Sequence, residues 1–140
     1  MARFFTEMFR RFFARRKAPL TGAPALRRLK TYSAQSGYVY QYFYEGHRLL
    51  SSDHEEGTEF VFSVSGDRKL WHPVEVVVPD ASLQNWEHAH DRQLYSTERY
   101  AVAKLSLFQA FDERAAPDRM REPVRVREAD VEAIIETLDL

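Results

Sequence analysis

The chain has 140 residues, 44% of them hydrophobic and 14% aromatic, which excludes wholesale disorder and fits one domain with a short appendage. It contains no cysteine, which excludes disulfides, thiolate nucleophiles and cysteine-bound metals, and it has no apolar run long enough to span a bilayer. The net charge of −1 is divided unevenly. Residues 1–30 carry nine basic side chains and one acidic one (+8), and the remainder carries 11 basic and 20 acidic ones (−9).

Residues 3–17 are predicted to form a basic, Phe-rich amphipathic helix. Large apolar side chains recur with a spacing of four and fill one half of the helical wheel, and most of the charged side chains fall on the other half. The apolar residues are Phe4, Phe5, Met8, Phe9, Phe12 and Phe13, and the basic contacts are Arg10, Arg11, Arg15 and Arg16. Because arginines interrupt every Phe cluster, the segment lacks the apolar core of a signal peptide.

Pro19, Gly22 and Pro24 end this helix and predict a linker. The sequence is therefore divided into an N-terminal basic helix (1–18), a basic linker (19–30) and a globular domain (31–140).

Three strands are predicted to open the globular domain. The first covers residues 38–44 and ends at a turn at Glu45-Gly46, and a polar loop follows over residues 48–57. The second and third cover about residues 60–64 and 70–78. The turn signal Ser65-Gly66-Asp67 between them predicts an antiparallel hairpin.

After residue 79, the spacing of the apolar residues changes to the spacing that is typical of helices. Helices are predicted over about residues 80–86, 97–114 and 129–138, with a short edge strand at residues 123–126. The predicted order is α-β-β-β-α-α-β-α. This indicates an α+β fold, with an antiparallel sheet of three to four strands and helices packed mainly on one face.

Alternating tyrosines in the first predicted strand provide a second candidate site. Tyr38, Tyr40, Tyr42 and Tyr44 would share one face of a regular strand, where they could stack on single-stranded nucleic acid. The phosphate contacts would come from Arg27, Arg28 and Lys30. The competing interpretation is that a helix packed on the sheet covers these rings as ordinary core.

The histidines provide a third candidate. All five lie between residues 47 and 90, and some have acidic neighbours, the combination used in metal and acid–base sites. Their spacing is poor, however, because His88 and His90 would point in different directions on a helix. We therefore expect no metal, no cofactor and no catalytic residues.

These observations favour a non-catalytic accessory or adaptor protein, which attaches through the N-terminal basic helix to a larger protein assembly or to an anionic membrane surface. We expect a cytoplasmic location, with peripheral membrane attachment left open. The alternatives are a nucleic-acid or ribosome-associated protein that uses the arm and the tyrosines, and a small enzyme with a His/carboxylate site. The opposite charges of the arm and the body also leave a homodimer open.

Overall fold

Five strands form one mixed sheet in the computed structural model, which describes residues 17–50 and 52–139. Neighbours in the sheet follow the chain order, with β4 and β5 parallel and every other neighbouring pair antiparallel. The strands are β1 (Lys30–Ser33), β2 (Val39–Leu49), β3 (Gly57–Ser65), β4 (His72–Pro79) and β5 (Val124–Arg125). The helices are α2 (Asp80–Ala89), α3 (Ser96–Glu113), the 3₁₀ helix η1 (Pro117–Arg121) and α4 (Glu128–Thr137).

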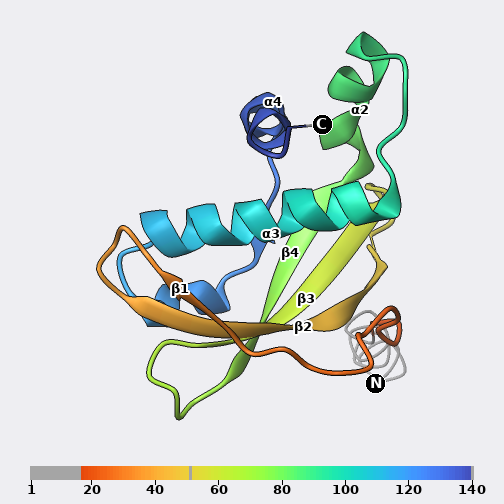
Figure 1. Cartoon of the computed structure of the whole chain (residues 1–140). Coiled ribbons are helices and arrows are strands. Elements are labelled where there is room, and N and C mark those ends of the chain that lie inside the picture. Colours follow the sequence, from red (N-terminus) through yellow and green to blue (C-terminus); the bar gives the residue numbers. More distant parts are fainter. Residues whose placement is uncertain (1–16, 51, 140) are drawn as a thin grey trace, which may run out of the picture.

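Helix α3 lies across one face of the sheet, with α2 and α4 beyond it on the same side (Figure 1). The core lies between α3 and the strands, where Phe62 of β3 and Val76 of β4 are buried together with Leu107 and Phe111 of the helix. Helix α4 buries its apolar face, including Val131, against the same core. The helical periods of α3 and α4 therefore account for their positions, because each helix has one apolar stripe to cover.

The prediction of an antiparallel sheet with three to four strands is wrong in strand number, strand order and direction. Strand β1 was not predicted, because Lys30 had been assigned to the linker and the four residues of β1 include only one large apolar side chain. It pairs antiparallel with β2, with Tyr32 opposite Tyr40. Such a short strand depends on the strand beside it and leaves little signal in its own sequence.

The predicted turn at Glu45-Gly46 is instead a β-bulge inside β2. The register with β3 shifts between Tyr44 and Gly46, and the strand continues to Leu49, which shortens the predicted loop. Gly46 has a φ of 130°, and a Cβ atom there would lie 2.7 Å from the carbonyl oxygen of Thr21. The glycine is therefore required by the close approach of Thr21, which forms a β-bridge with His47, rather than by a turn.

Strand β5 runs parallel to β4, which makes the sheet mixed. Val124 pairs with Val76, and the long connection through α2, α3 and η1 brings the chain back in the same direction as β4. Two residues of strand carry no information about direction, because direction is fixed by the length of the connection and by helix packing.

Helices α2, α3 and α4 begin within one residue of their predicted starts. At α3 the capping residue is Tyr95 rather than Ser96 or Thr97, and its backbone N–H donates to the carboxylate of Glu98 at 2.8 Å. The predicted N-terminal basic helix lies outside the described residues.

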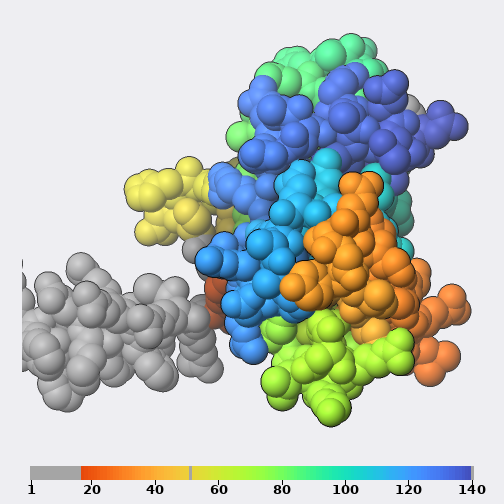
Figure 2. All heavy atoms as spheres, turned by 90° about the vertical axis from the view of Figure 1, so that its left-hand side faces the viewer, coloured from red at the N-terminus to blue at the C-terminus, as the bar shows by residue number. Residues whose placement is uncertain are grey.

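The turn between β1 and β2 is fastened to the end of α3. The backbone N–H of Gln35 donates to Asp112 and the hydroxyl of Ser36 donates to the carbonyl of Phe111, both at 2.9 Å. Tyr32 also donates to Asp112, at 2.8 Å. Figure 2 shows this turn, in orange, lying against the end of α3. Strand β1 is therefore held by side-chain contacts in addition to its short ladder with β2.

Candidate binding cleft

A cleft lies between β2 and the N-terminal half of α3, on the helix-covered face of the sheet. Two neighbouring pockets of about 430 and 420 Å³ share Tyr44 of β2 and Tyr100 of α3 in their walls. These two rings touch, with their centroids 4.8 Å apart. Tyr42 and Tyr44 point to the same side because alternate residues of a strand share a face. The cleft therefore follows from where the tyrosines fall in the sheet and on the helix.

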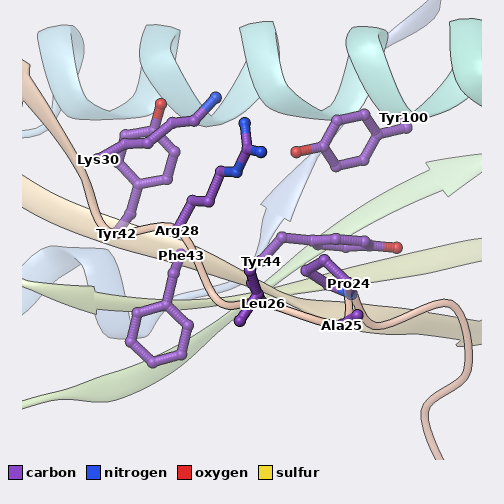
Figure 3. Close-up of a pocket in the computed structure, with 9 residues that line it drawn as sticks. All are labelled: Pro24, Ala25, Leu26, Arg28, Lys30, Tyr42, Phe43, Tyr44 and Tyr100. Atoms are coloured by element: carbon purple, nitrogen blue, oxygen red, sulfur yellow. The ribbon is translucent and has the colours of Figure 1, made fainter.

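The first pocket, here called the basic pocket, is bordered by the exposed segment 24–30, by β2 and by Tyr100. Figure 3 shows the charged ends of Arg28 and Lys30 directed toward α3, on the same side as the hydroxyl groups of Tyr42 and Tyr100. The position of Lys30 is set by β1, where it lies opposite Tyr42. Two cationic groups and two hydroxyl groups are thus directed to one region under the helix.

Lys104 adds a third cation, one helical turn after Tyr100. Its side chain is half-buried, with the ammonium 5.8 Å from the centre of the Phe108 ring. Burial and the neighbouring Lys30 lower the pKa of Lys104 to about 8. In the part of the chain that the structure describes, none of Arg28, Lys30 and Lys104 forms an ion pair with a carboxylate. The basic pocket therefore carries a concentration of positive charge without a balancing acidic group.

The tyrosine hydroxyls of the basic pocket are protonated at neutral pH. Burial, with Tyr100 and Tyr32 nearby, raises the pKa of Tyr42 to about 12, and burial also raises the pKa of Tyr100. Neither hydroxyl has a hydrogen-bond partner among residues 17–50 and 52–139, whereas that of Tyr32 donates to Asp112. Both O–H groups are therefore available to donate to a ligand.

The second pocket, here called the histidine pocket, lies on the other side of Tyr44 and Tyr100. The hydroxyl of Tyr44 is 3.0 Å from Nδ1 of His47, and Phe60 forms part of the wall. Gly22 lies so close that a Cβ atom there would be 2.5 Å from the His47 ring. The His47 ring is thus enclosed by protein groups.

Arg99, which also lines the histidine pocket, is neutralised within the protein. Its guanidinium is 3.0 Å from the carboxylate of Asp80 and 3.8 Å from that of Glu87. The cations without a described partner are therefore gathered in the basic pocket and not spread along the whole cleft.

The residues of the predicted nucleic-acid face do not form one surface. Tyr40 is 0% and Tyr42 is 4% exposed, and the ring of Tyr40 stacks on Phe111 with centroids 4.2 Å apart. These two rings have no free face for a base, so the core interpretation holds for them. Tyr38 precedes β2 and is 40% exposed, while Tyr44 is half-buried in the cleft.

The three basic residues of that prediction are also divided. Arg27 lies on the opposite face, where it pairs with Glu45 at 3.2 Å and lies over the ring of Phe43 at 5.3 Å. Arg28 and Lys30 face the basic pocket. Tyr42 and Tyr44 of the same prediction line this pocket with them, whereas Tyr38 and Tyr40 do not.

The N-terminal site residues lie outside the described part of the chain. They are Phe4, Phe5, Met8, Phe9, Arg10, Arg11, Phe12, Phe13, Arg15 and Arg16. The first described residue, Lys17, is placed by ion pairs with two carboxylates of the outer sheet face, Glu59 at 3.4 Å and Glu75. The segment therefore joins the body at a defined point on β3 and β4.

The histidines are dispersed. His90 stacks on Trp86 and contacts its backbone oxygen at 2.9 Å, His47 contacts Tyr44, and His54 and His88 are exposed. Over residues 17–50 and 52–139, no three histidine or acidic side chains are grouped closely enough to hold a metal ion. The proximity of the histidines in sequence is not reproduced in space.

Sequence reasoning missed Tyr100 and Lys104 as site residues. Tyr100 was assigned to the core face of its helix, and Lys104 lies one turn later, beside that apolar stripe. A lysine at the edge of a core-facing stripe is a weak signal, because such side chains commonly extend to solvent. The like-charge neighbour, Lys30, is 74 positions away in the sequence and meets Lys104 only after folding.

Replacing Lys30 with glutamine is expected to stabilise the protein at about pH 7. With its folded pKa near 8 and a normal value of 10.5, Lys104 binds more protons in the unfolded state between these pH values, so stability rises with pH in this window. Removing Lys30 returns the pKa of Lys104 toward normal and weakens this rise. Urea unfolding from about pH 7 to about pH 9.5 should show the variant's advantage shrinking as pH increases.

Lys69→Gln is the matched control, because Lys69 is an exposed lysine in the turn between β3 and β4. It should not change the dependence on pH over the same range. If Lys30→Gln and Lys69→Gln behave alike, Lys30 and Lys104 do not repel each other.

No protein-family model matches the chain, and neither does any curated protein or any solved structure. Within the described part of the chain, no helix is both long enough and apolar enough to cross a bilayer.

Proposed function

We propose that the protein is a non-catalytic accessory subunit that attaches through its N-terminal basic segment to a larger protein assembly or to an anionic membrane surface. The observation that carries this proposal is the charge division, with a net charge of +8 on residues 1–30 and −9 on the remainder. Six large apolar residues accompany the basic ones within residues 4–13. Such a segment can insert apolar side chains into a groove or an acyl boundary while its arginines contact acidic groups.

The way this segment joins the body supports the proposal. The ion pairs of Lys17 with Glu59 and Glu75 fix the end of the segment on the outer face of β3 and β4. The cleft lies on the other, helix-covered face. The acidic body also repels an anionic surface, which directs attachment to the basic segment.

The test compares two sets of substitutions in the full-length chain. One variant replaces Phe5, Phe9 and Phe12 with serine, and the other replaces Arg10, Arg11 and Arg15 with glutamine. Recovery of native complexes and sedimentation with vesicles are measured for both variants and for the unaltered chain. Vesicles of neutral lipid and vesicles containing anionic lipid are compared, because basic residues contribute about 1 kcal/mol each at an anionic surface.

Both variants are expected to lose most of the association. Attachment to a membrane predicts binding to anionic but not to neutral vesicles, with a strong dependence on salt. Docking in a protein groove predicts that the phenylalanine variant fails at every salt concentration. If both variants recover the same material as the unaltered chain, the segment is not the attachment site.

A further inference from the structure

Arg28 and Lys30 line the basic pocket and Lys104 lies beside Lys30, so three cations are gathered at this place at a cost to the fold. Lys30 and Lys104 repel each other, and the half-buried ammonium of Lys104 has lost part of its water. Glu45 of β2, the acidic residue next to Tyr44, pairs with Arg27 at 3.2 Å and not with these three cations. A bound anion would remove both penalties, because it supplies the missing opposite charge.

The hydrogen-bonding groups of the pocket suit an anion with several acceptor oxygens. Arg28 and Lys30 direct their charged ends under α3, where the hydroxyls of Tyr42 and Tyr100 lie (Figure 3). All four are donors at neutral pH. Three cations balance a doubly charged phosphate better than a singly charged carboxylate, and charge-assisted bonds of this kind are the stronger ones.

The opposite wall of the pocket is apolar and partly flat. Pro24 and Leu26 lie beside the ring of Tyr44, and the segment that carries them crosses in front of β2 (Figure 3). A flat ring could pack against Tyr44 and these side chains while its charged group reached the lysines. The pocket volume of about 430 Å³ lies within the usual range for small-molecule sites.

We propose that the basic pocket binds a phosphomonoester joined to a flat ring, a ligand with the size and chemistry of a nucleoside monophosphate. Arg28, Lys30 and Lys104 hold the phosphate, Tyr42 and Tyr100 donate to its oxygens, and Tyr44 contacts the ring. This site goes beyond the proposed attachment function and uses none of residues 1–16. The two proposals can therefore fail independently.

Titration calorimetry of the full-length protein with four probes tests the ligand class. The probes are adenosine monophosphate, 3′,5′-cyclic adenosine monophosphate, inorganic phosphate and adenosine. The monophosphate should bind at least about tenfold more tightly than each of the others. The cyclic compound has one negative charge in place of two, inorganic phosphate has no ring, and adenosine has no charge.

Variants locate the binding in the pocket. Lys104→Gln is expected to weaken binding of the monophosphate by about tenfold or more, and Tyr100→Phe by a smaller factor, because a charged donor contributes more than a neutral one. Lys69→Gln should bind like the unaltered chain. Circular dichroism and urea unfolding show that each variant is folded, which separates loss of a contact from loss of structure.

The titration of Lys104, followed by NMR of its side-chain Cε group, gives a direct readout. The charged group facing it is Lys30 of β1, and Lys30 lines the basic pocket together with Arg28, Tyr42, Tyr44 and Tyr100. Binding of the monophosphate should raise the pKa of Lys104, because an anion favours the ammonium form. Lack of monophosphate binding at millimolar concentration, equal binding of inorganic phosphate, or an unchanged Lys104 titration each overturns the proposal.

Discussion

Replacing Arg48 with methionine is expected to destabilise the protein by about 3–5 kcal/mol, because it removes the closest partner of a buried carboxylate. Glu59 is 4% exposed, and Nε of Arg48 donates to it at 2.9 Å. Lys17 is farther away, at 3.4 Å, and also pairs with Glu75. Methionine keeps most of the length of the side chain, so the effect measured is mainly the loss of charge and hydrogen bonding.

A double variant separates the ion pair from the packing. Arg48→Met with Glu59→Gln should recover much of the loss, because no buried charge is left uncompensated. Arg125→Met is the matched control. Arg125 is also a strand arginine that pairs with a glutamate, Glu55, but its side chain is largely exposed. The control should cost less than about 1 kcal/mol. Urea unfolding of the unaltered chain, Arg48→Met, Glu59→Gln and the double variant provides the cycle. Equal losses for Arg48→Met and Arg125→Met would mean that burial of the pair does not matter.

The burial of Glu59 could not be predicted from the alternation of apolar and polar residues in β3. The alternation of Phe60, Phe62 and Val64 predicted that these residues share one face of a strand, and in the structure all three belong to the core on the helix-covered side of β3. The same pattern places Glu59 on the opposite face, where a charged residue is expected to be solvated. It is buried because Arg48 and Lys17 converge on it from other segments. Burial of this kind depends on long-range pairing, which local periodicity does not record.

Predictions from local pattern were most accurate for the helices and least accurate for the edges of the sheet. Helices α3 and α4 have long apolar stripes, whereas β1 and β5 have four and two residues and are held by neighbouring strands. The candidate cleft was difficult to predict for the same reason, because its residues are brought together by long-range contacts. Arg28 and Lys30 are neighbours in the sequence and could be recognised there as a basic cluster. Lys104 is distant in the sequence and comes close to Lys30 only in the folded protein.

Phe111→Ala is expected to cost about 3–5 kcal/mol of stability, the range for deleting a fully buried aromatic side chain. Phe111 is 0% exposed and stacks on Tyr40, with ring centroids 4.2 Å apart. It also contacts Tyr32, whose ring centroid is 5.7 Å away. The alanine variant would leave a cavity among rings that belong to three different elements, and these rings are too rigid to fill it.

Phe108→Ala is the appropriate comparison, because Phe108 lies on the same helix and is only partly buried. Its ring stacks on Tyr32 at 4.3 Å but borders solvent, so its loss should cost about 1–2 kcal/mol. Urea unfolding of both variants measures the difference. A cost for Phe111→Ala no larger than that for Phe108→Ala would mean that the stacked rings between β1, β2 and α3 do not form the main core. The position of α3, and with it the cleft, would then depend on the contacts of α3 with β4 and α4 instead.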